Sequence, residues 1–134
     1  MKSLTRLQVG EALEEIKLPP VSRMDLIKYS GASGDFNPIH TIDQEAIKSG
    51  LPGIIAHGMW TMGHLAKFFT VYYEEGYIQD YTIRFKGMVF LNDVITLKSS
   101  LSDLDENKLT FDVKALNQEN RVVLEGDIVF NLYK

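Results

Sequence analysis

The C-terminal half of the chain constrains the fold most, because it holds four successive segments with the composition of β-strands. Residues 77–90, 93–104, 108–118 and 121–133 are rich in β-branched and aromatic side chains and alternate apolar with polar residues in places. The breaks between them, LND, DEN and QEN, are short and consist mainly of turn residues. Strands joined by short turns pair in antiparallel fashion, so we expect a meander of about four strands.

An almost entirely apolar segment precedes these strands. HGMWTMGHLAKFFTVYYEEG, residues 57–76, leaves little polar face before Gly76. It predicts one long helix that is buried on most sides. With one more strand near the N-terminus, before the break at LPP, the expected fold class is α+β: a curved antiparallel sheet of about five strands wrapped around a long central helix.

Two shorter helices are expected before the apolar segment. Ser22, with Asp25 three residues later, is placed as an N-cap for a helix that Gly31 and Gly34 would stop. In TIDQEAIKSG, Asp43 is a candidate cap, and the glycine that ends this stretch is a C-terminal stop.

Length and composition exclude several classes of protein. The 134 residues are enough for one domain, residues 1–134, and the net charge of −4 gives no basic surface for nucleic acid. No apolar run approaches the roughly 20 residues of a membrane-spanning helix, and the start lacks the apolar core of a secretory signal, so we expect a cytoplasmic protein without membrane contact. The chain has no cysteine, which excludes disulfides, thiol nucleophiles and thiolate metal sites.

The stretch SGDFNPIH, residues 33–40, gathers an acid, an amide, a proline and a histidine where a helical pattern breaks. Asp35 and His40 are five residues apart, so only a fixed turn could bring their side chains together. Pro38 fixes its own φ and disfavours the α region for Asn37, whose side chain can bond to local backbone. The loop either simply ends a helix or aims Asp35 and His40 at one substrate, and the turn composition by itself favours the first reading.

His57 and Gly58 stand at the start of the apolar segment, in GIIAHGMW. The first N–H groups of a helix have no internal partner and lie at the positive end of its dipole, so they suit a developing negative charge. Gly58 would leave room for a carbonyl to approach them. The alternative is that Gly58 only allows close packing of helix and sheet, and this segment alone favours neither.

No metal or cofactor is assigned. His57 and His64 are seven residues apart, but the chain has neither an HExxH nor an HxxxH spacing. Its glycines form no phosphate loop or dinucleotide fingerprint, and it has no GxSxG nucleophile elbow.

Two stretches together resemble the signature of a known family: YSGASGDFNPIH, followed by GIIAHGMWTMGHLAKFF. They are similar to the hydratase signature of the MaoC-like dehydratases, which are (R)-specific enoyl-thioester hydratases of the hot dog fold, also called the hydratase 2 type. The resemblance extends from Ser22 to Phe90. It implies a single hot dog domain in which Asp35 and His40 are the catalytic dyad. It also implies that Asn37 supports the loop and that Asn37, His57 and Gly58 belong to the substrate-binding part of the site.

Two positions depart from the family pattern. Met88 stands where the family has proline, which leaves the local wall of the acyl tunnel undefined. Asn92 stands where the family has glycine, and because asparagine tolerates the left-handed conformation, we expect the turn to be kept.

The resemblance implies hydration and dehydration between a 2-enoyl thioester and an (R)-3-hydroxyacyl thioester in fatty acid metabolism, without a cofactor. The thioester would be carried by CoA or by an acyl carrier protein. A homodimer is expected, with a heterodimer with a non-catalytic relative as the alternative. Two other functions stay open: a hot dog acyl-thioesterase and a non-catalytic acyl-binding subunit.

Overall fold

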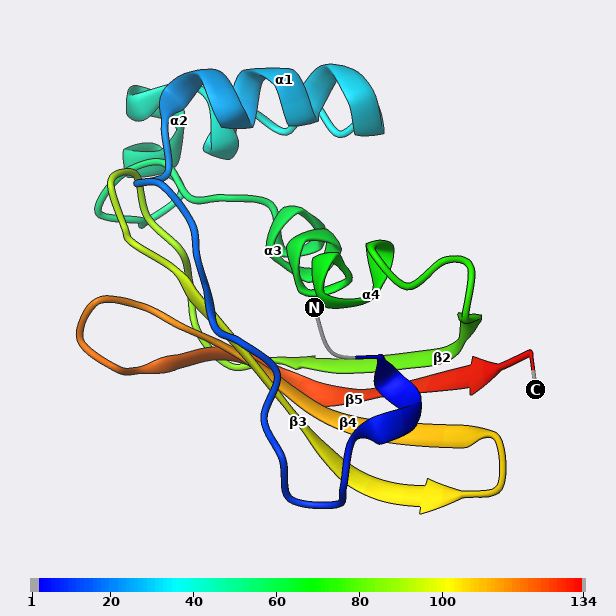
Figure 1. Cartoon of the computed structure of the whole chain (residues 1–134). Coiled ribbons are helices and arrows are strands. Elements are labelled where there is room, and N and C mark those ends of the chain that lie inside the picture. Colours follow the sequence, from blue (N-terminus) through cyan, green and yellow to red (C-terminus); the bar gives the residue numbers. More distant parts are fainter. Residues whose placement is uncertain (1–2, 134) are drawn as a thin grey trace.

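The computed structural model describes residues 3–133 of the chain, so residues 1, 2 and 134 of the expected domain lie outside the described part. Its frame is one antiparallel sheet of five strands in the order β1-β3-β4-β5-β2 (Figure 1). The strands are β1 (Ile16–Lys17), β2 (Gly76–Phe85), β3 (Thr96–Asp105), β4 (Lys108–Leu116) and β5 (Val122–Leu132). The expected count of about five antiparallel strands is therefore confirmed. The expected four-strand meander holds for β3, β4 and β5 only, because β2 pairs with β5 at the opposite edge from β1 and not with its successor β3.

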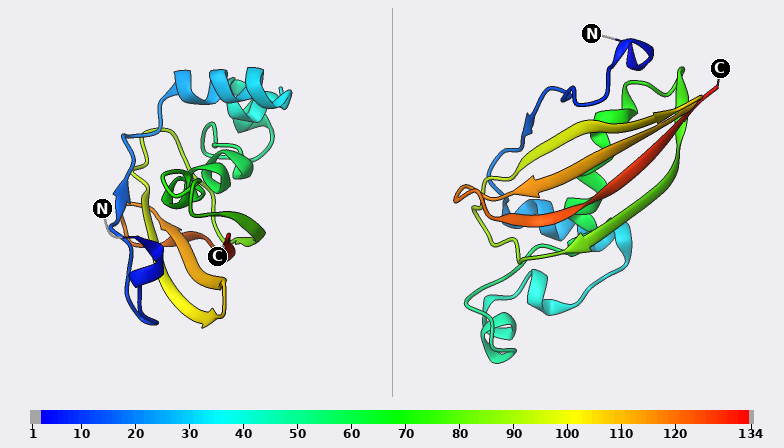
Figure 2. Two further views of the ribbon diagram at one scale, coloured as in Figure 1. Left: turned by 45° about the vertical axis from the view of Figure 1, so that its right-hand side comes forward. Right: turned by 90° about the horizontal axis from the view of Figure 1, so that it is seen from below.

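The helices form two layers on one side of this sheet. The inner layer is α3 (Gly58–Leu65) and α4 (Lys67–Thr70), and the outer layer is α1 (Arg23–Ser33) and α2 (Asp43–Lys48), as Figures 1 and 2 show. Short 3-10 turns occur at Leu4–Arg6 and Pro38–His40. The strands lie in front of the helices when the molecule is viewed from below (Figure 2, right).

The core lies between the sheet and the inner helical layer. Along β4, Phe111 and Val113 are buried while the alternating Asp112 and Lys114 are exposed, as a strand with one covered face requires. The ring of Phe69 packs edge-on against Phe111, with centroids 4.9 Å apart. This contact anchors the apolar segment on the centre of the sheet.

The apolar segment is shorter and more interrupted than expected. It forms two helices that separate at Ala66, and no α-helix continues through residues 71–75 to Gly76. At the break the Ala66 N–H donates to the Gly63 carbonyl, while the Met62 carbonyl accepts a hydrogen bond from the Tyr81 hydroxyl of β2. The expectation of burial on most sides is also wrong in part, since Met59 is 55% exposed and Val71 56% exposed.

The outer helices begin as their sequences suggest, with one exception. Ser22 caps α1 in a complete capping box with Asp25, and Gly34 ends it at φ 78°. Asp43 does not cap α2, because it is the first helical residue. Its carboxylate instead lies 3.1 Å from the guanidinium of Arg23.

The loop between β2 and β3 keeps the turn that Asn92 was expected to allow. Asn92 has a φ of 71°, in the left-handed region. Its N–H donates to the Val21 carbonyl at 2.8 Å, and the Val21 N–H donates to the Asp93 carbonyl at 2.9 Å. The turn thus ties the sheet to the start of α1, while Met88 in the same loop is 50% exposed.

None of the helices within residues 3–133 combines the length and the apolar character needed to cross a bilayer.

The Tyr81 hydroxyl is expected to stabilise the break between α3 and α4. Burial raises the pKa of Tyr81, so the phenol remains a donor at neutral pH. Tyr81→Phe leaves the partly buried Met62 carbonyl without this donor and should lower the free energy of unfolding by about 1–2 kcal/mol in urea titrations. Tyr77→Phe is the matched control, since the exposed Tyr77 hydroxyl accepts from the Asn131 side chain at the surface, and it should change stability by less than about 0.5 kcal/mol. Equal effects of the two substitutions would contradict this role.

Candidate active site

The loop from Ser33 to His40 is fixed by hydrogen bonds between its own side chains and backbone. Ser33 Oγ accepts from the Asp35 N–H at 3.1 Å, and Asp35 Oδ1 accepts from the Asn37 N–H at 3.1 Å. Asn37 Oδ1 in turn accepts from the Ile39 N–H at 3.2 Å and caps the 3-10 turn that starts at Pro38. The predicted local bonding of Asn37 is confirmed, whereas its contact with a substrate stays a prediction.

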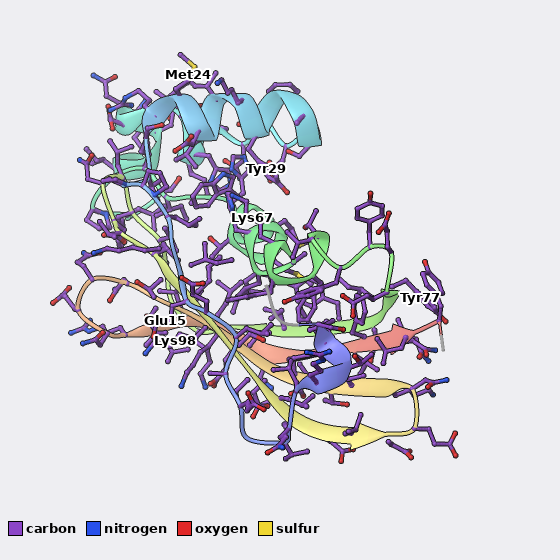
Figure 3. All side chains as sticks on the ribbon, viewed as in Figure 1. Glu15, Met24, Tyr29, Lys67, Tyr77 and Lys98 are labelled. Atoms are coloured by element: carbon purple, nitrogen blue, oxygen red, sulfur yellow. The ribbon has the colours of Figure 1, made fainter. Side chains whose placement is uncertain are left out.

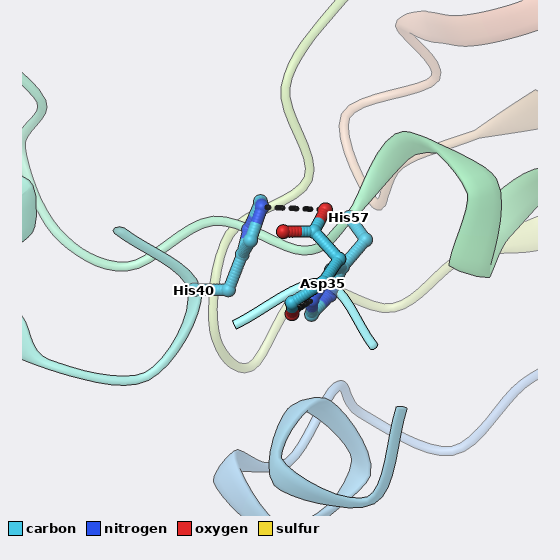
Figure 4. Close-up of side chains that lie close together, drawn as sticks. All are labelled: Asp35, His40 and His57. Atoms are coloured by element: carbon cyan, nitrogen blue, oxygen red, sulfur yellow. Dashed lines mark hydrogen bonds and ion pairs between the residues drawn. The ribbon is translucent and has the colours of Figure 1, made fainter. Parts of the chain in front are cut away.

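This loop brings Asp35 and His40 together (Figure 4). Asp35 Oδ2 lies 3.9 Å from His40 Nε2, and the Asp35 side chain is 53% exposed while that of His40 is 9% exposed. His40 Nδ1 lies 2.7 Å from the Ile55 carbonyl. Because a carbonyl can only accept, Nδ1 carries the hydrogen and the lone pair of neutral His40 is at Nε2, on the Asp35 side. The pair thus presents an acid oxygen and a basic nitrogen to the same space.

His57 packs behind this pair. Its ring stacks on that of His40, with centroids 3.8 Å apart and planes 23° apart, and Tyr29 of α1 meets it edge-on at 4.8 Å. His57 Nε2 lies 3.2 Å from the Asp35 carbonyl and 3.2 Å from Ser30 Oγ. Burial lowers the pKa of His57, although the hydrogen bond to the Asp35 carbonyl opposes the shift, so the ring favours its neutral form.

The side chain of His57 was not expected in this position. The sequence places His57 before the apolar helix as a substrate-binding residue, 17 positions after His40. No helix or strand period relates such distant residues, so only the tertiary fold reveals the stacked rings. The same holds for Ser30 and Tyr29, which the helical pattern of α1 marks only as helix residues.

Gly58 is the first residue of α3, and its backbone packs against the sheet. A Cβ at this position would lie 2.7 Å from Cε1 of Phe85 in β2, closer than carbon atoms approach. The structure therefore supports the packing explanation for Gly58. Its role in receiving a thioester oxygen stays a prediction.

Asp35, His40 and His57 are also close enough to raise the question of a metal ion. Each offers a ligand atom, and these atoms lie within 4.8 Å of one another. The two imidazoles are stacked, however, and nitrogen lone pairs lie in the ring planes, so they do not converge on one ion. His57 Nε2 is also turned to the Asp35 carbonyl. The arrangement does not fit a metal centre, and no step is derived through one.

Two hollows lie away from the pair. One, of about 640 Å³, lies against the polar side chains of the sheet, including Arg84, Lys98 and Asp112. The other, of about 480 Å³, lies between α1 and α3, with Tyr29 and Lys67 in its lining (Figure 3). Neither is lined by Asp35 or His40, which open to solvent through the exposed acid.

The third histidine, His64, lines the second hollow. It meets Trp60 edge-on, with ring centroids 4.5 Å apart, and burial lowers its pKa. Within residues 3–133, its ring packs on Trp60 and not on His40 or His57, and its buried Nδ1 has no hydrogen-bond partner. His64 is therefore separate from the candidate site.

Comparison with known proteins gives a consistent assignment. The family described as "MaoC like domain" matches residues 6–123. The chain is 26% identical over 130 residues to the mitochondrial 3-hydroxyacyl acyl-carrier-protein dehydratase of Arabidopsis thaliana, covering 93% of this chain and 77% of that one. It is 30% identical over 116 residues to the fatty acid synthase subunit beta of Aspergillus oryzae, covering 84% of this chain but only 6% of that much longer protein.

Among solved structures, the R-hydratase PhaJ1 of Pseudomonas aeruginosa superposes with a TM-score of 0.87 at 23% identity, over 96% of this chain and 83% of that one. At this identity the likeness establishes the fold, which is the expected hot dog fold. The match to the family model covers most of the chain. The chain therefore belongs to the MaoC-like domain family, a family of dehydratases that act on acyl thioesters in fatty acid metabolism.

Proposed function

We propose that the protein catalyses (R)-specific hydration and dehydration between a 2-enoyl thioester and a (R)-3-hydroxyacyl thioester, with Asp35 and His40 as its catalytic residues. The observation that carries this proposal is the approach of Asp35 Oδ2 to 3.9 Å from His40 Nε2, with the other ring nitrogen held by the Ile55 carbonyl. This separation is too long for a direct hydrogen bond, and a water bound to both atoms fits the chemistry of the pair.

In the hydration direction, His40 Nε2 takes a proton from this water while Asp35 orients it. The water oxygen bonds to C3 and the electrons of the C2–C3 double bond move toward the thioester carbonyl. As these electrons return, C2 takes the proton that His40 removed from the water, so that one water is added in all and His40 is neutral again. Dehydration runs through the same steps in reverse. Because the loop supplies the water from one side only, a thioester bound in one orientation gives one configuration at C3.

The negative charge that develops on the thioester oxygen needs donors. The first N–H groups of α3, at Gly58 and the residue after it, point out of the helix at its positive end. We place the thioester oxygen there. His57 contributes to substrate binding only as the residue that begins this turn, since its side chain is 2% exposed.

The substrate carrier and the assembly are part of the proposal. The acyl group is carried by CoA or by an acyl carrier protein. The chain forms a homodimer, or a heterodimer with a non-catalytic relative, because β2 is an edge strand of the sheet. The apolar residues Met59, Tyr77 and Phe85 are each about half exposed on α3 and β2, which also favours a partner there.

The first experiment follows a short 2-enoyl-CoA by its conjugated thioester absorbance and by free thiol, in the presence of a chelator. We expect absorbance to fall without release of thiol, and chiral chromatography to show the (R)-3-hydroxyacyl product. Thiol release would indicate a thioesterase. Binding without either change would indicate an acyl-binding subunit.

Asp35→Asn and His40→Ala should each lower kcat by about 100- to 10 000-fold, the usual contribution of a positioned acid or base. Asp43→Asn is the matched control for the acid, because Asp43 is an exposed carboxylate outside residues 33–40 that pairs with Arg23 and not with His40. His64→Gln is the control for the histidine. A dyad variant with near wild-type turnover, or controls as damaged as the dyad variants, would refute the assignment.

Gly58→Ala tests whether the start of α3 binds substrate or only packs. The added Cβ meets Phe85, so the single variant should lose both stability and about 100-fold in kcat. Phe85→Ala in the same chain removes the clash. If the first N–H groups of α3 receive the thioester oxygen, the Gly58→Ala/Phe85→Ala double variant should regain stability. Its kcat should still be lower than that of the Phe85→Ala single variant. Full recovery of kcat would leave Gly58 with a packing role only.

Sedimentation equilibrium of the purified chain should give twice the mass of one chain at micromolar concentration, as a homodimer requires. A single-chain mass that doubles only when a relative is added would indicate the heterodimer. A single-chain mass under both conditions would contradict the proposed assembly.

A further inference from the structure

His57 touches both members of the Asp35–His40 pair without reaching the surface. Its ring covers one face of the His40 ring, its Nε2 is bonded to the main chain of Asp35, and it is 2% exposed. A side chain this buried does not meet a substrate that arrives from solvent. Any effect of its imidazole on the reaction therefore passes through Asp35 and His40.

The hydrogen bonds of His57 define its tautomer. The Asp35 carbonyl can only accept, so His57 Nε2 carries the hydrogen. Nδ1 is then an unprotonated nitrogen, and it is buried without a hydrogen-bond partner among residues 3–133. The titratable groups that face the ring are Asp35, His40 and Tyr29 of α1. A second proton would make His57 a buried cation beside His40. Burial disfavours that charged form and so lowers the pKa of His57.

His57 supplies two restraints that the pair otherwise lacks. The bond from His40 Nδ1 to the Ile55 carbonyl fixes one atom of the ring but still permits the plane to tilt about that bond. The stacked face of His57 blocks this tilt on one side. Its Nε2–H also fixes the main-chain carbonyl of Asp35. The Asp35 side chain itself is half exposed and accepts a hydrogen bond from the Asn37 N–H.

We propose that neutral His57 is a positioning residue, which holds the His40 ring by stacking and the Asp35 main chain by its Nε2–H. This inference rests on the function proposed above, because the orientation of the pair matters only if the pair acts on a substrate. A misplacement of a catalytic group by about 1 Å can cost about 100-fold in rate. His57 thus acts on kcat through geometry and leaves substrate affinity unchanged.

Two substitutions separate the two restraints. His57→Phe keeps a flat ring against His40 but has no N–H for the Asp35 carbonyl. His57→Gln keeps an N–H donor of similar reach but has no ring to stack. We expect each to lower kcat about 10- to 100-fold with KM within about twofold of wild type, and His57→Ala to lower it further. Ser30→Ala, which leaves His57 in place, should have a smaller effect and gives a milder variant if a His57 variant fails to fold.

The matched control is His64→Gln. His64 is another histidine whose pKa is lowered by burial, but it lies within α3, is only partly buried and packs on Trp60. It should lose stability without loss of kcat. If kcat falls in proportion to stability in all variants, His64→Gln included, His57 is structural and the proposal fails. A rise in KM at unchanged kcat would also overturn it, because it would show direct contact with substrate.

Imidazole 15N spectra provide a readout that does not need turnover. In the wild-type protein, His57 should show a protonated Nε2 and an unprotonated Nδ1 near neutral pH. In His57→Phe and His57→Gln the His40 signals should shift, while in His64→Gln they should stay. The opposite tautomer, or unchanged His40 signals, would refute the positioning role even if the hydratase activity holds. Absence of wild-type turnover with the expected spectra would refute the proposed function instead.

Discussion

The hydrogen bond between His40 Nδ1 and the Ile55 carbonyl is the contact on which the rest of the site depends. It joins the loop after α1 to the segment that leads into α3. That segment is itself fixed on two sides, because the Ile55 N–H donates to the Ile39 carbonyl and the Ala56 N–H donates to the Val89 carbonyl. The imidazole is therefore oriented by backbone that is bonded both to the loop after α1 and to the loop after β2. Since the bond commits Nδ1 as donor, it also determines which nitrogen of His40 is free.

The sheet contributes to the site by holding the start of α3. Phe69 and Phe111 anchor the apolar segment at its centre, and Phe85 packs against Gly58 at its beginning. Tyr81 of β2 bonds to the Met62 carbonyl and satisfies a helix carbonyl at the break. The direction of the first turn of α3, and so of its free N–H groups, is set by contacts with β2 rather than by α3 alone.

Features set by local sequence could be predicted, and those set by tertiary contacts could not. The strands follow from alternation, the start of α1 from the Ser22 capping box, and the turn from the tolerance of Asn92 for a positive φ. The break at Ala66 was missed because its apolar surroundings favour a continuous helix. At the break the Met62 carbonyl accepts a hydrogen bond from Tyr81, which lies 19 residues later in the sequence, so no local pattern reveals this contact.

The site divides in the same way. Pro38 and Asn37 indicated a rigid loop, and the catalytic roles proposed for Asp35 and His40 come from the resemblance to a family. The stacking of His57 on His40 joins two separate loops through a contact that no sequence period describes. Gly58 was ambiguous from sequence because a packing glycine and an oxygen-binding glycine have the same residue type. The closeness of the Phe85 ring to Gly58 favours the packing role, and the oxygen-binding role stays a prediction.

The unequal exposure of Asp35 and His40 leaves the pair one open side. His40 is 9% exposed and one face of its ring is covered by His57, while its free nitrogen lies toward Asp35, whose side chain is 53% exposed. In the proposed reaction, water and the thioester both reach the pair from this open side. Phe36, next to the acid, is 70% exposed, and an apolar side chain at that edge gains from being covered. A bound acyl chain or a second subunit over Phe36 would dry the site and strengthen the interaction of the pair with its water.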